Sequence, residues 1–147
     1  MKPFDKLLEE DIASYEGRHD DLIFQVPAFY RLLVNILDDP LLPSRLRPLV
    51  LAGIAYFILP VDVVPEDIYG PYGYVDDLFL TAFIAQKVRE VVGSDEIIET
   101  NWDGEAPIIP LIQEILEREE ELIGDKKNQI FQFIGLPILL GEPGLSK

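Results

Sequence analysis

Apolar residues recur every three or four positions along most of the chain, which is the spacing typical of amphipathic α-helices. No stretch of useful length alternates between apolar and polar residues, as a half-buried β-strand would. The sequence therefore predicts an all-α fold, a single helical bundle of five or six helices in one domain over residues 1–147. The helices are expected over residues 3–16, 20–38, 44–59, 76–92 and 107–123, with a helical tail in 125–147.

The two most apolar helices, 44–59 and 76–92, are expected to form a helical hairpin at the centre of the bundle. From residue 49 to 59 the first of them reads LVLAGIAYFIL, which has no polar side, a pattern that indicates a helix surrounded by neighbours. Ala52, Gly53 and Ala55 lack bulk and would let another backbone approach closely. Within 20–38, Pro27 is compatible with the first turn of a helix or with a kink.

The chain is more hydrophobic than a soluble monomer needs to be. Hydrophobic residues make up 48% of its 147 residues, and the mean hydropathy of +0.15 excludes intrinsic disorder. The surplus predicts contact with a protein partner, with a second copy of the chain or with a membrane surface. The longest apolar run, 48–61, would span about 21 Å as a helix, too short for the roughly 30 Å hydrocarbon core of a bilayer.

The net charge of −15 argues against nucleic acid as a partner, because phosphate backbones would be repelled. Twelve acidic residues against one basic residue, Arg118, lie between positions 90 and 125. This segment is either a solvated helix face and loop or a docking surface for a basic partner. The chain has no cysteine, and its first residues carry acids where a signal peptide would be apolar, so a cytoplasmic location is expected, with membrane association left open.

The connection between the two hairpin helices, residues 60–75, gathers the candidate site residues. It is rich in proline and glycine, and Pro60 and Pro65 make it stiff. The candidate residues are five acids in and just after this connection: Asp62, Glu66, Asp67, Asp76 and Asp77.

This region carries a motif, Pro60-x-Asp62-x-x-Pro65-acid followed by Gly73-x-x-Asp76-Asp77. The motif, over about residues 45–86, resembles the YkvA-like domain family, a group of small helical proteins of unknown function. The resemblance implies a helical hairpin with an acidic connection and no established reaction. Either Glu66 or Asp67 would be the motif acid.

Three interpretations of the acids remain open. In the first, they cap and brace the connection by accepting hydrogen bonds from backbone amides at the start of the second helix. They are also suited to a divalent cation, Ca²⁺, Mg²⁺ or Mn²⁺, which prefers oxygen ligands. Thirdly, Asp62 and a more exposed Asp77 would suit an acid and base pair in a metal-dependent hydrolase.

The sequence contains no complete catalytic set, since the single histidine, His19, lies in a distant polar hinge. The first functional hypothesis is therefore a helical interaction or scaffold module that docks on a protein partner or on itself. A divalent-cation protein or metal-dependent hydrolase is the alternative, and a peripheral membrane protein is a weaker one. Whether the chain is an enzyme is left open, with the balance against it.

Overall fold

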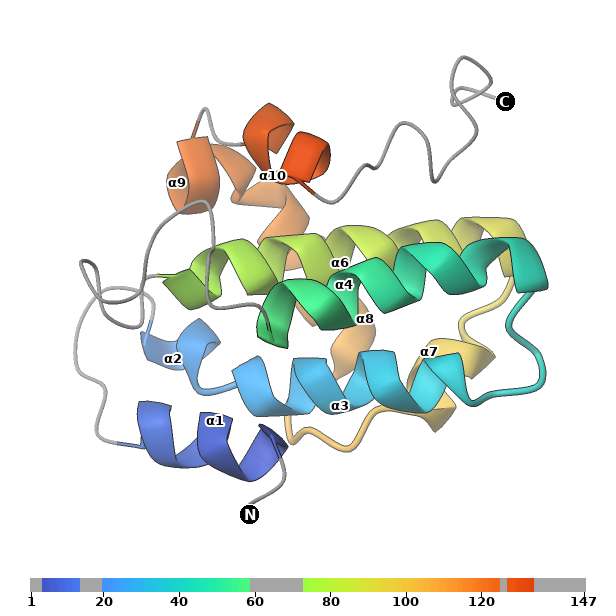
Figure 1. The fold of residues 1–147 in the computed structure, drawn as a ribbon, viewed down its shortest axis with the longest axis horizontal. Coiled ribbons are helices and arrows are strands. Elements are labelled where there is room, and N and C mark those ends of the chain that lie inside the picture. The colour runs from blue at the N-terminus through green and yellow to red at the C-terminus, as the bar shows by residue number, and fades with distance from the viewer. Residues whose placement is uncertain (1–3, 14–19, 59–72, 125–126, 134–147) are drawn as a thin grey trace.

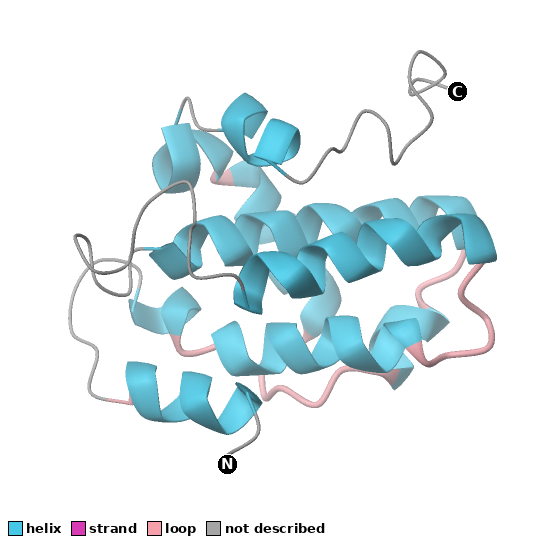
Figure 2. Ribbon diagram, viewed as in Figure 1, coloured by secondary structure: helices cyan, strands magenta, loops and turns pink. Residues whose placement is uncertain are grey.

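The computed structural model describes residues 4–13, 20–58, 73–124 and 127–133, and this part of the chain contains helices and no strand (Figure 2). The predicted all-α fold is therefore confirmed. In chain order the elements are α1 (Phe4–Ile12), α2 (Asp20–Ile23), α3 (Val26–Leu37), the 3-10 turn η1 (Ser44–Leu46), α4 (Arg47–Ile58), α6 (Gly73–Val92), α7 (Glu96–Thr100), α8 (Ile108–Glu117), α9 (Glu119–Ile123) and α10 (Lys127–Phe133).

The long helix α6 lies at the centre of the bundle. It packs against α2, α3, α4, α7, α8 and α9, and α3, α4 and α6 run in alternating directions (Figure 1). Every residue from 75 to 82 is buried, so this half of α6 has neighbours on all sides. The predicted hairpin of two apolar helices is present as α4 and α6.

Helix α4 is not surrounded, which corrects the expectation drawn from its sequence. Its main neighbours are α3, α6 and η1, and the side turned away from them is open to solvent. Leu51 is 48% exposed and Ile58 is 49% exposed. A helix that is apolar on all sides therefore buries only its inner face, and its outer face meets water without a single polar side chain between Pro48 and Ile58.

Gly53 lies on the inner face of α4, where α3, α4 and α6 meet. A Cβ atom added there would stand 2.6 Å from Ile84 Cδ1 of α6 and 3.0 Å from Leu33 Cδ1 of α3. The predicted close approach is therefore made by Gly53, whereas Ala55 of the same small-residue run faces solvent. Two neighbouring helices can reach α4 because this position has no side chain.

Two of the predicted helices are each divided in two, and with α7 and α10 this raises the number of α-helices in the described residues to nine. The segment 20–38 breaks between α2 and α3 because Pro27 has no N–H to continue the hydrogen-bond ladder. The chain turns there, and Gln25 N donates to Leu22 O at 2.9 Å. The segment 107–123 breaks at Arg118, whose ψ of +22° leaves the helical region.

Candidate functional site

Asp76 and Asp77 lie in the core near the start of α6. Their exposed fractions are 0% and 1%. Helix α6 begins at Gly73, three residues earlier than predicted, so both acids are inside the helix and not at its cap. The expectation that Asp77 is an exposed member of an acid and base pair is therefore wrong.

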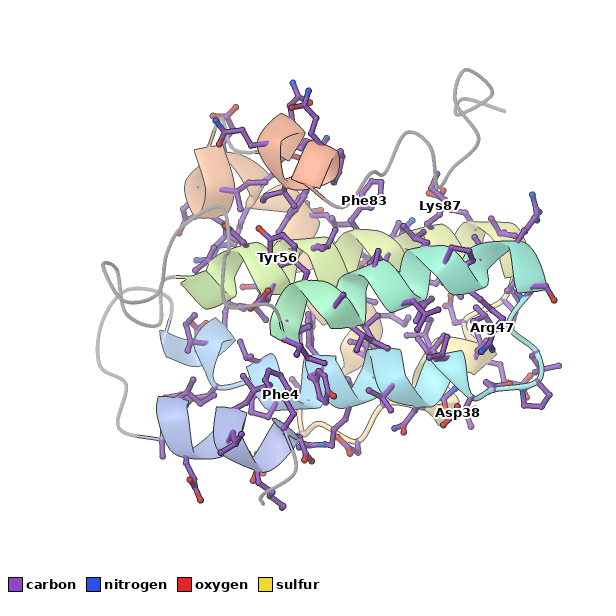
Figure 3. All side chains as sticks on the ribbon, in the orientation of Figure 1. Phe4, Asp38, Arg47, Tyr56, Phe83 and Lys87 are labelled. Carbon is purple, nitrogen blue, oxygen red and sulfur yellow. The ribbon has the colours of Figure 1, made fainter. Side chains whose placement is uncertain are left out.

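Tyr56 connects α4 to Asp76. Its side chain comes from α4 (Figure 3), and its hydroxyl donates to Asp76 Oδ2 at 3.5 Å, a long hydrogen bond between two buried groups. The bond joins the two helices of the hairpin near the acidic connection. Tyr56 is thus a packing residue with a bonded hydroxyl.

Thr81 adds a third polar group to the buried stretch of α6. It follows Asp77 by one helical turn and shares its face, and its hydroxyl makes no hydrogen bond with any described residue. Asp76, Asp77 and Thr81 are the polar or charged side chains that are buried in the described part of the chain. Burying an ionised carboxylate is costly unless hydrogen bonds or an opposite charge compensate for it, so these positions are candidates for a special role.

The other three predicted site residues, Asp62, Glu66 and Asp67, lie outside the described residues. Among the residues that are described, no three acidic or histidine side chains are grouped so as to hold a metal ion. The cation site and the catalytic pair, both of which need residues of the 60–75 connection, therefore stay predictions.

A second candidate surface was not expected from the sequence. The outward face of α4 consists of side chains that share one side of the helix: Arg47, Pro48, Leu51, Ile54, Ala55 and Ile58. Apart from Ile54, which is half-buried, all are exposed. One residue in the sequence did indicate this face. Arg47 is charged and marks the solvent side of the helix, and positions 51, 54 and 58 follow it at helical spacing.

Arg31 forms a further cluster that the sequence did not reveal, because its partners lie 22 and 72 positions away. Its Nη1 donates to Glu9 of α1 at 2.9 Å, and its Nε donates to Asp103 at 2.9 Å. Partial burial lowers the pKa of Arg31, but the bonds and charges of Asp103 and Glu9 outweigh it and raise the pKa. The guanidinium therefore stays charged and ties α1 and the 101–106 loop to α3.

Comparison with known proteins places the hairpin in a family. The model of a family described as "Protein of unknown function (DUF1232)" matches residues 47–83. The chain is also 31% identical over 134 residues to "Uncharacterized protein ORF9" of Methanothermobacter thermautotrophicus, with 91% of each chain covered. The chain belongs to the DUF1232 family.

The DUF1232 match runs from the start of α4 to Phe83 of α6, so it contains Tyr56, Asp76, Asp77 and the outward face of α4. It lies within the stretch that resembles YkvA-like proteins, and that finer likeness stays a prediction. No solved structure matches this DUF1232 protein. Within the part of the chain that is described, every helix is too short or too polar to span a bilayer.

Proposed function

We propose that this DUF1232 protein is a helical interaction module that associates with itself through the outward face of α4. The observation that carries the proposal is the exposure of Leu51 and Ile58 on the outward face of α4, which has no polar side chain between Pro48 and Ile58. Isolated apolar side chains are common on protein surfaces, but a contiguous apolar face is typical of an interaction site. Covering such a face contributes about 25 cal/mol for each Å² removed from water.

The rigid inner side of α4 suits this role. Tyr56 and Phe57 are buried, and Gly53 lets α3 and α6 pack closely behind the helix. The hydrogen bond between Tyr56 and Asp76 braces α4 against α6 from within the hairpin. A face that is held in place before binding loses little conformational entropy when it is covered.

Charge favours a second copy as the partner. Residues 40–61 contain Arg45 and Arg47 and no acid, in a chain whose net charge is −15. Two such molecules repel each other over most of their surfaces, and this segment is where they can approach with the least repulsion. A basic partner would instead be attracted to the acids elsewhere on the molecule.

Leu51→Glu is expected to abolish self-association. Wild-type protein should show a rising average mass in sedimentation as its concentration increases, because association is driven by mass action. The variant should stay at the monomer mass of 16.7 kDa, since a buried unpaired carboxylate is costly. Circular dichroism would establish that it is still folded.

Leu41→Glu is the matched control, because Leu41 is 60% exposed in the 38–43 connection and outside the outward face of α4. It makes the same change of charge and should associate like the wild type. A wild-type protein that remains monomeric at every concentration would contradict the proposal.

Divalent-cation binding is a second candidate function, favoured by the burial of the adjacent carboxylates Asp76 and Asp77. If it is correct, calorimetry should detect saturable binding of Ca²⁺, Mg²⁺ or Mn²⁺. The same cation should raise the melting temperature, and a hundredfold excess over Kd stabilises by about 2.7 kcal/mol. Asp62→Asn combined with Asp76→Asn should abolish both effects, and no heat with any of the three cations would eliminate this candidate.

A further inference from the structure

We infer that two copies of the chain pair through α4 in antiparallel orientation about a two-fold axis, forming a closed dimer. The inference rests on the proposed self-association and adds its partner surface, direction and stoichiometry. Arg47, Leu51, Ile54 and Ile58 follow one another at intervals of four, three and four residues. This is the spacing of the a and d positions along a two-helix packing seam.

The orientation follows from the positive charges at the N-terminal end of α4, where Arg45 and Arg47 lie. In a parallel pair, Arg45 and Arg47 of one copy would lie beside the same residues of the other and repel them. In an antiparallel pair they are separated by the length of the helix, about 18 Å for its 12 residues. The guanidinium of Arg47 donates to Leu37 O of its own α3 at 2.7 Å, so its charge is held at the N-terminal end of α4 and two such charges would lie side by side in a parallel pair.

The antiparallel seam also sets which side chains meet. When a positions face d positions of the opposite helix, Leu51 packs on Ile54 of the second copy. Ile58 then packs on the aliphatic stem of Arg47 of the second copy, whose guanidinium is bonded to Leu37 O of its own molecule. Ala55 is small enough to let the helices approach beside these contacts.

Such a pair is closed, because the same face is used on both molecules and no copy of it remains open. The contact face of one helix, about 18 Å long and about 10 Å wide, buries less than the roughly 1,200–2,000 Å² in total of standard specific interfaces. The dimer is therefore expected to dissociate on dilution. Its assembly should also strengthen with salt, since salt screens the repulsion between two chains of charge −15.

Cysteine cross-linking can read the orientation directly, because the chain has no cysteine of its own. The test mixes untagged Ile58→Cys protein with tagged Pro48→Cys protein, and both positions are exposed on the outward face of α4. A disulfide needs Cα atoms within about 7 Å, so mild oxidation should produce the mixed disulfide between the two proteins. Ile58→Cys alone should give almost no disulfide, and Leu41→Cys is the control for chance collisions.

The possible results are distinguishable. A mass that levels off at two chains, together with the mixed disulfide, supports the inference. If sedimentation shows a dimer and Ile58→Cys alone cross-links efficiently, the antiparallel pairing is overturned while the proposed self-association stands. Assemblies that grow beyond two chains overturn the closed pairing, and a protein that is monomeric throughout overturns both proposals.

Discussion

Gly53→Leu is expected to lower the free energy of unfolding by about 3 kcal/mol or more, or to prevent folding. Even the Cβ atom would stand 2.6 Å from Ile84 Cδ1 and 3.0 Å from Leu33 Cδ1. A leucine adds three more heavy atoms in the same direction, and overpacking a well-filled core typically costs about 1–3 kcal/mol before any separation of helices is counted. Urea denaturation followed by circular dichroism measures the effect.

Two variants test the physical reason. Gly53→Ala should change stability much less, because its Cβ meets only the ends of flexible side chains and alanine gains about 1 kcal/mol of helix propensity over glycine. Ala55→Leu places the same bulk on the exposed side of α4 and should leave the monomer's stability nearly unchanged. If Gly53→Leu unfolds at the same urea concentration as the wild type, α3 and α6 do not meet α4 at this glycine.

Phe29→Ala is expected to cost about 4 kcal/mol. Phe29 of α3 is fully buried, and truncation of a buried aromatic residue removes about 3–5 kcal/mol by loss of apolar burial and formation of a cavity. Its ring also meets Trp102 edge-on, with centroids 5.3 Å apart. Because Trp102 is the single tryptophan, its fluorescence should shift in the variant even under conditions in which the protein remains folded.

Phe24→Ala is the matched control for this prediction. It makes the same chemical change five residues earlier, between α2 and α3, where the phenyl ring is half exposed. Its cost should be about 1 kcal/mol or less, in line with surface substitutions, and the fluorescence of Trp102 should not change. Equal costs for the two variants would mean that Phe29 does not belong to the core.

These stability tests bear on function because α3, α4 and α6 form the support of the outward face of α4. Leu51 and Ile58 can stay exposed only because the opposite side of the same helix is tightly packed around Gly53, Tyr56 and Phe57. Variants on the two sides should therefore separate, with inner ones affecting folding and outer ones affecting association. The same separation distinguishes a contact surface from exposed hydrophobic residues without a role.

Local chemistry was sufficient to predict most of the helices and their ends. The periodicity of apolar residues predicted the hairpin, and the glycines at 93 and 124, with φ of +77° and +55°, lie where helices were expected to stop. The indole N–H of Trp102 donates to Ala106 O of its own loop at 2.7 Å. These features depend on residues close together in sequence, so the sequence contains the information.

The burial of the candidate site residues could be known only from the tertiary structure. The pattern of apolar residues shows how apolar a helix is, but it does not show how many other helices pack around it. Both hairpin helices were expected at the centre, with α4 surrounded by neighbours, yet only α6 is surrounded, and it carries Asp76 and Asp77 into the core. Acids next to a proline- and glycine-rich connection suggested exposed caps, and only the packing of six helices around α6 shows that they are buried. The sequence by itself determined an all-α chain with an apolar helical hairpin. Only the tertiary structure decided which faces of these helices meet water, because that depends on contacts between residues far apart in the chain.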